Sequence, residues 1–135
     1  MNWTFDIRGV PEFIRVKSSG AFRRDDISRL FDELSELDEF APGCRVLLDG
    51  TGLELENVSD HDLFQASNEL IRRNRDFAYT KLAIVTTPED LHVGHKFEKI
   101  TEYGSRTIMH VFDDETHALH WLVGGVFAAT SILSS

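Results

Sequence analysis

Three short apolar runs alternate with amphipathic segments through most of the chain, and this alternation constrains the fold more than any other feature. The runs cover residues 45–49, 81–86 and 106–112. The first of them is apolar at nearly every position, as expected of a strand covered on both faces. A strand, a helix and another strand in succession is the pattern of parallel strands joined by right-handed crossovers. The sequence therefore predicts an α/β fold built on a largely parallel sheet.

Four helices are predicted, one after each buried run and one before the first of them. They are expected over residues 25–40, 59–74, 91–103 and from 113 through 122. In the first of them, apolar residues recur at helical spacing while acidic residues occupy the other face. The apolar positions that carry this prediction are Ile27, Leu30, Phe31, Leu34 and Leu37.

Two further runs, residues 3–7 and 13–17, open the chain and are predicted to pair as a hairpin or as neighbouring strands. Ser18-Ser19-Gly20 is predicted to be a loop, and Gly50-Thr51-Gly52 a tight turn that leaves a buried strand. The predicted fold is therefore a single-domain α/β structure, with a mixed five-stranded sheet and about four helices. It spans residues 1–135, of which 123–135 form an apolar C-terminal tail.

The charge of the chain restricts its partners. The 23 acidic residues exceed the 14 basic ones, and the formal net charge is −9. A negative field repels phosphate backbones and anionic membrane surfaces, so nucleic acid is not an expected partner. The apolar stretch 121–133 is too short and too polar for stable membrane insertion, and the first residues do not resemble a signal peptide. We therefore expect a cytoplasmic protein.

Several short sequence segments along the chain resemble the SpoIIAA-like branch of the STAS domains. The ending is the most telling: Val111-Phe112-Asp113-Asp114-Glu115 leads into Ala118-Leu119-His120-Trp121-Leu122. The other segments are Ser19-Gly20-Ala21-Phe22 before an acidic helix, Val46-Leu47-Leu48-Asp49, and Leu82-Ala83-Ile84-Val85. The resemblance extends roughly from Asp6 to Leu122 and rests chiefly on the order of these parts.

The resemblance implies a SpoIIAA-like fold and a non-enzymatic function. The best-understood relatives are bacterial anti-sigma-factor antagonists, which change partners when a serine is phosphorylated. That serine begins the helix after the second parallel strand, where this chain has Ser59. The resemblance therefore makes Ser59 a candidate phosphoacceptor. The chain has Asn57-Val58-Ser59-Asp60-His61 where the family has Asp-Ser-Ser-Gly-Leu.

The residues around Ser59 also predict a purely structural role for it. Ser59 followed by Asp62 approximates a capping box at a helix N-terminus. A phosphate there would interact with the helix dipole, but nearby acidic side chains would repel it. Both interpretations remain open at this point.

A partner or ligand site is expected at the edge of the sheet where the parallel strands end. Loops at the carboxyl ends of parallel strands converge on one rim in open α/β sheets. The residues that the predicted loops bring to this rim are Asp49, Thr51, Asp60, Thr86, Thr87 and Asp113.

No catalytic residue, metal ligand or cofactor is predicted. His92 and His95 are three residues apart, as are His117 and His120, but neither pair has a third ligand in an expected position. Cys44 follows a Pro-Gly turn and precedes a buried strand, where a structural cysteine is expected.

Three functions remain as alternatives. The first is a regulatory protein-interaction module with an unknown protein partner. The second is a binder of a small apolar, lipid-like ligand in a cavity between sheet and helices, which the ten phenylalanines permit. The third is an unrecognised enzyme that uses His or Asp side chains on the rim. The apolar tail either packs on the sheet or covers a second copy of the chain in a homodimer.

Overall fold

The computed structural model describes residues 1–134, with side chains described through Gly124. Five strands form one mixed sheet, as predicted: β1 (Asn2–Asp6), β2 (Ile14–Ala21), β3 (Arg45–Glu54), β4 (Lys81–Val85) and β5 (Ile108–Phe112). The helices are α1 (Arg24–Glu36), α2 (Asp60–Arg72), α3 (Asn74–Phe77), α4 (Leu91–Thr101) and α5 (Glu115–Ser134), with a 3₁₀ turn at Pro88–Asp90. The four predicted helices correspond to α1, α2, α4 and α5, while α3 is a single added turn.

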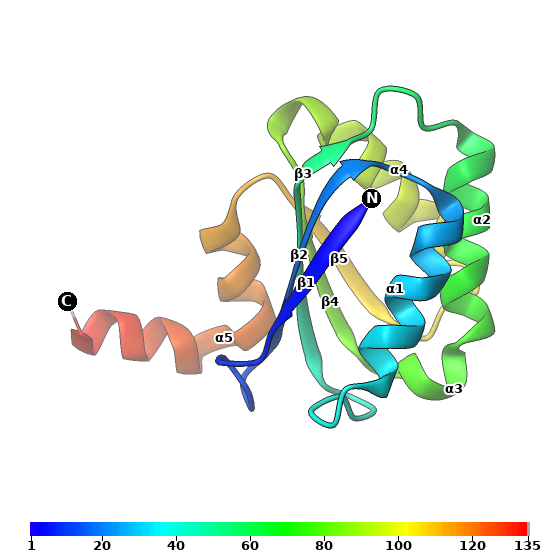
Figure 1. Ribbon diagram of the computed structural model, residues 1–135. Helices are drawn as coiled ribbons and strands as arrows, with labels where there is room; N and C mark the ends of the chain where they lie inside the picture. Colours follow the sequence, from blue (N-terminus) through cyan, green and yellow to red (C-terminus); the bar gives the residue numbers. More distant parts are fainter. Residues whose placement is uncertain (135) are drawn as a thin grey trace.

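The strands lie in the sheet in the same order as in the sequence. β1 is antiparallel to β2, whereas β2, β3, β4 and β5 are mutually parallel. Each crossover leads to the next strand in the same direction across the sheet, and each is right-handed. All three crossover helices therefore lie on one face of the sheet. Figure 1 shows α1, α2 and α4 on that face and the beginning of α5 on the other.

Alternate residues of the central strands supply two separate cores. On β3, Val46 and Leu48 pack against the α1 and α2 layer, whereas Leu47 packs against α5. On β4, Leu82 belongs to the first core and Ala83 to the second. This division follows from the pleat, since successive side chains of a strand point to opposite faces.

Two segments predicted as a loop and a turn are instead parts of strands. Ser18-Ser19-Gly20 continues β2, and Gly50-Thr51-Gly52 continues β3, because these segments pair with each other beyond a register shift at Lys17/Ser19. A side chain at Gly52 would place its Cβ 3.0 Å from the Ser18 carbonyl oxygen. The glycine therefore permits the close approach of two strands, and the turn prediction was wrong.

Three helices end earlier than their sequence patterns predicted. α2 ends at Arg72 rather than at Asn74, where α3 begins. α1 ends at Glu36 because Leu37 has an extended backbone, so the residues from Leu37 to Phe40 lie outside the helix. α4 ends at Thr101 rather than at Tyr103. Leu37 and Phe40 nevertheless pack against the first core from outside the helix. The helical spacing of the apolar residues therefore predicted correctly which side chains are buried, but not the residue at which the helix ends.

The apolar tail is described only in part. Val123 is buried in the second core, and the backbone at Gly124 leaves the helical region with a φ of 62°. Whether the rest of the predicted tail, 125–135, packs on the sheet or on a second copy lies outside the described side chains. Within the described part of the chain, no helix is long and apolar enough to cross a bilayer.

Arg73 connects the first two crossover helices. Its guanidinium donates to Asp32 Oδ1 and Ser28 Oγ on α1, at 2.8 and 2.9 Å, and to Glu69 Oε2 on α2, at 2.6 Å. The hydrogen bond from Arg73 is the main reason that the pKa of Glu69 is lowered. The side chains of Arg73 and Glu69 are only 14% and 18% exposed, so solvent screens their ion pair weakly, whereas Asp32 is 58% exposed.

We predict that Arg73→Ala lowers the free energy of unfolding by about 1–3 kcal/mol at pH 7, because Glu69 loses the less exposed of its two arginine partners. The matched control is Arg72→Ala, which removes a 73% exposed arginine that also contacts Glu69 and should cost less than about 1 kcal/mol. Glu69 stabilises the fold above its unfolded pKa, and this contribution is lost as pH falls through its lowered folded pKa. Urea unfolding should therefore show a penalty that shrinks in acid, and equal penalties for the two variants would contradict the account.

Gly94 allows α4 to lie close to β5. A Cβ at this position would be 2.5 Å from Val111 Cγ1, which is closer than atoms can approach. We predict that Gly94→Ala destabilises the protein by about 1–3 kcal/mol through overpacking, despite the better helix propensity of alanine. Lys99→Ala, on the exposed side of the same helix, should change stability by less than about 0.5 kcal/mol. Thermal unfolding measures both, and a stabilised Gly94→Ala variant would contradict the packing described here.

Candidate functional site

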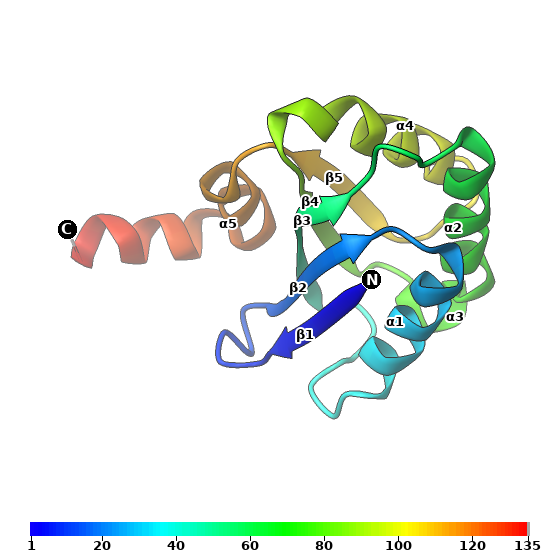
Figure 2. The same cartoon turned by 45° about the horizontal axis from the view of Figure 1, so that its top comes forward.

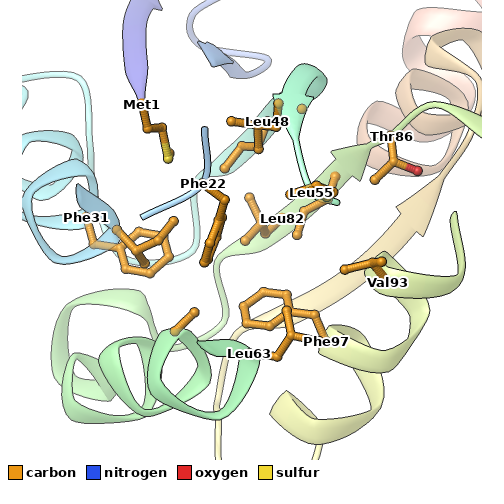
Figure 3. A pocket seen from close by; sticks show the side chains of 16 residues that line it. Met1, Phe22, Phe31, Leu48, Leu55, Leu63, Leu82, Thr86, Val93 and Phe97 are labelled. Carbon is orange, nitrogen blue, oxygen red and sulfur yellow. The ribbon is translucent and has the colours of Figure 1, made fainter. Parts of the chain in front are cut away.

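An apolar pocket lies between the sheet and the crossover helices. Figure 3 shows Phe22, Leu63 and Phe97 directed toward one space, from the segment after β2, from α2 and from α4 respectively. The sheet closes its other side. The remaining lining residues are Met1, Ile27, Phe31, Leu48, Gly50, Leu53, Leu55, Ala66, Leu82, Ile84, Thr86, Val93 and Gly94.

The pocket opens to solvent rather than being filled by the core. Ile84 belongs to β4, which is paired on both sides, yet it remains partly exposed, as do Phe97 and Leu55. The space open to the centre of a water molecule is about 80 Å³. A buried water needs only about 10–15 Å³ on this measure, so the pocket has room for more than one.

The lining offers a ligand almost no hydrogen-bonding side chain. Thr86 is the only lining residue with a polar side chain. Its hydroxyl donates to the Thr87 carbonyl oxygen at 3.0 Å. Its methyl faces Gly94, since a Cβ there would be 3.3 Å from Thr86 Cγ2. The one charged group on a lining residue, the α-ammonium of Met1, is already paired with Asp26 Oδ2 at 3.3 Å. The lining side chains can therefore accept hydrocarbon but offer no partner to a charged group of a ligand.

The local sequence explains how β3 contributes to this lining. Leu48 and Gly50 are on the same face of β3 as the pocket, and Leu53 and Leu55 continue the lining from the end of the strand. Because Gly50 has no side chain, it fills none of the space above Leu48. The sequence prediction missed these residues, although the alternation of Leu53, Glu54, Leu55 and Glu56 is a visible strand signal.

Ser59 is the N-cap of α2, as one of its two interpretations predicted. The Asp62 N–H donates to Ser59 Oγ at 3.1 Å, and the Ser59 N–H donates to Asp62 Oδ2 at 3.0 Å, which completes a capping box. The backbone hydrogen bond from Ser59 is the main reason that the pKa of Asp62 is lowered. Ser59 is exposed, and its role as a phosphoacceptor stays a prediction.

The predicted rim residues do not form one cluster. Thr86 lines the apolar pocket, whereas Thr87 donates to Asp90 Oδ2 at 3.1 Å at the start of the 3₁₀ turn. Asp60 forms an ion pair with Lys96 Nζ at 2.9 Å, which connects α2 with α4. Asp113 is exposed after β5.

The other two rim residues belong to the opposite face of the sheet. Asp49 and Thr51 alternate with Leu48 and Gly50 along β3, so they point away from the pocket. Asp49 Oδ1 accepts hydrogen bonds from the Thr51 N–H and hydroxyl, at 3.0 and 2.6 Å. Their proposed binding role remains a prediction, with no shared cavity to support it.

Histidine and cysteine side chains show no arrangement for metal binding or nucleophilic chemistry. Within the described part of the chain, no group of three or more His, Cys, Asp or Glu side chains could hold a metal ion. Glu98 accepts hydrogen bonds at the surface, and His110 Nδ1 lies 3.0 Å from its Oε1. Burial raises the pKa of the Cys44 thiol, which favours the unreactive protonated form.

Comparison with known proteins gives a structural match. No family model matches the sequence, and no curated protein matches it. The structure is similar to the crystal structure of an uncharacterised protein of the DUF3478 family, with a SpoIIAA-like fold, from Shewanella loihica. The TM-score is 0.58 and the identity 19%, over 90% of this chain and 92% of that one. The SpoIIAA-like fold expected from the sequence is confirmed, and an identity this low shows the fold alone.

We predict that Ser59→Ala lowers the free energy of unfolding by about 0.5–2 kcal/mol, whereas Ser59→Asp changes it little, because aspartate also caps helices. Ser35→Ala is the control, since Ser35 lies inside α1 and its hydroxyl only donates to the Asp32 carbonyl oxygen at 2.9 Å. Urea unfolding measures all three variants. Equal stability of Ser59→Ala and the unsubstituted protein would show that the capping box contributes nothing.

Proposed function

We propose that the protein is a non-enzymatic binding module that takes a small apolar ligand in the pocket between the sheet and α1, α2 and α4. One observation carries this proposal: a solvent-open space lined by 16 residues, of which only Thr86 has a polar side chain. The Thr86 hydroxyl donates to the Thr87 carbonyl oxygen and has no base beside it among the lining residues, and no other lining side chain is an acid, a base or a nucleophile. This supports binding rather than catalysis.

The energetics of the empty space favour a hydrocarbon occupant. A water molecule held there needs two to four polar partners, and the lining side chains do not supply them. Transfer of each methylene group from water into such a space is favourable by about 0.8 kcal/mol. Replacement of water by an apolar ligand is therefore favourable for two reasons. The displaced water regains hydrogen bonds in bulk solvent, and the ligand removes apolar surface from water.

The size of the space limits the ligand. Its volume of about 80 Å³ is below the roughly 300–1,000 Å³ of pockets for drug-sized molecules, and below a cavity of about 150 Å³ that holds benzene. A short alkyl chain fits such a space if its polar end stays at the solvent-open mouth. A long acyl chain would have to displace the partly exposed side chains Phe22 and Phe97.

Protein interaction is the second candidate function. The exposed position of Ser59, as the N-cap of α2, favours it. A phosphate at this position would add about −1.5 to −2 charge beside Asp60 and Asp62. A regulatory partner that contacts this end of α2 would detect such a change through charge repulsion.

The first test is titration of the protein with 1-hexanol, followed by methyl NMR. We expect saturable shifts at pocket methyl groups, such as those of Leu63 and Val93. Ala66→Leu places about three more carbon atoms in the space. Since this displaces about two methylene groups of ligand, binding should weaken roughly tenfold.

Phe64→Leu is the matched control, because Phe64 is on α2 but 53% exposed and outside the lining. Its titration should equal that of the unsubstituted protein. If Ala66→Leu fails to fold, Phe97→Ala replaces it, and its enlarged pocket should bind hexanol with slower dissociation. Absence of saturable shifts in the folded, unsubstituted protein would contradict the proposed function.

A further inference from the structure

A second, polar cleft adjoins the apolar pocket and shares Phe22 with it. Its lining is Ala21, Phe22, Glu54, Glu56, Asn57 and Val58, and its volume is about 100 Å³. The Phe22 N–H donates to the Glu54 carbonyl oxygen at 3.3 Å, which fixes the end of β2 to the end of β3 at this boundary. The cleft and the apolar pocket are therefore neighbouring spaces that share the Phe22 side chain.

The residues at the end of β3 and just after it contribute alternately to the apolar pocket and to the polar cleft. Leu53 and Leu55 line the apolar pocket, whereas Glu54 and Glu56 line the cleft. Glu54 is the last residue of β3, and Glu56 lies in the turn that follows. This short stretch of chain therefore contributes both apolar side chains to the pocket and two carboxylates to the cleft.

Basic side chains do not neutralise the two glutamates. Neither the pocket nor the cleft is lined by a Lys, Arg or His residue. Among the ion pairs found within the described residues, none includes Glu54 or Glu56. The α-ammonium of Met1, which lines the pocket, pairs with Asp26 Oδ2 at 3.3 Å. Lys96 pairs with Asp60, and Arg24 lines the groove between α1 and α2. Arg23 follows Phe22 but lines neither space.

We propose that the pocket discriminates by charge: it takes short-chain amphiphiles with an uncharged head, such as an alcohol, amide or ester, and rejects the carboxylate of a free fatty acid. This inference rests on the proposed function, because it concerns the head of a ligand whose tail occupies the apolar pocket. A carboxylate head at the mouth would face two unpaired carboxylates in a protein of net charge −9. At an effective dielectric constant of about 20, like charges several ångströms apart repel by an energy worth about tenfold in affinity or more.

The test compares 1-hexanol with hexanoate, which have the same chain length, by methyl NMR titration at pH 7.5 and low ionic strength. We expect hexanoate to bind about tenfold more weakly or worse. The double variant Glu54→Gln/Glu56→Gln should bring hexanoate close to hexanol and leave hexanol binding unchanged. The matched control is Glu33→Gln/Glu36→Gln, which removes the same two charges from the exposed face of α1 and should keep most of the discrimination.

The outcomes separate the two proposals. If hexanol binds and hexanoate binds equally well, the charge discrimination is overturned and the proposed function stands. If neither ligand binds, the proposed function itself fails. If both double variants restore hexanoate binding equally, net charge rather than the mouth of the pocket is responsible, and the inference about Glu54 and Glu56 is overturned.

Discussion

Right-handed crossovers between strands that follow one another in order determine how the rest of this structure is arranged. Because every crossover advances in the same direction, α1, α2 and α4 all cover one face of the sheet, and the opposite face is left to α5. Figure 2 shows the resulting layers with the carboxyl ends of the parallel strands tilted toward the viewer. The layer of three helices must cover five twisted strands, and the pocket lies where these helices do not close over β3 and β4.

Small residues set the depth of this gap. Gly94 lets α4 rest directly on Val111 of β5, while Gly50 leaves the middle of β3 without a side chain in the pocket. Arg73 connects α2 to α1 at a distance from the pocket, and the Asp60–Lys96 ion pair connects α2 to α4 near it. The helices are thus held to each other by polar contacts on the outside, while the apolar space beneath them remains unfilled. This arrangement makes the pocket a consequence of the fold rather than a local defect in packing.

The sequence predicted the order of elements well because local patterns report local structure. The apolar runs identified β3, β4 and β5, and the Ser59–Asp62 spacing identified the capping box, since both signals lie within a few neighbouring residues. The strand extensions at Ser18–Gly20 and Gly50–Gly52 were missed because each depends on pairing with the other across about thirty residues. Glycine there signalled a turn in the sequence, whereas the structure uses it for the close approach of two strands.

The sequence predicted the type of candidate site but not the residues that form it. A cavity between sheet and helices was one of the alternatives, but its lining comes from several segments, and no pattern within one segment reveals a space between them. The rim residues were chosen on the rule that parallel strands end at one edge, and that rule does not say on which face of the sheet each side chain lies. Asp49 and Thr51 are on the α5 side for this reason, while Thr86 faces the pocket. Which residues share a site therefore depends on the face of the sheet to which each side chain points, and not only on the edge at which the strands end.

The central claim is that an apolar space open to ligands exists between Phe22, Leu63 and Phe97. A crystal of the protein pressurised with xenon tests it directly, because xenon occupies apolar cavities without polar partners. The account predicts a strong anomalous peak within van der Waals distance of these three side chains, and none in the polar cleft beside Glu54 and Glu56. A crystal in which these side chains close the space, so that xenon does not enter, would contradict the account.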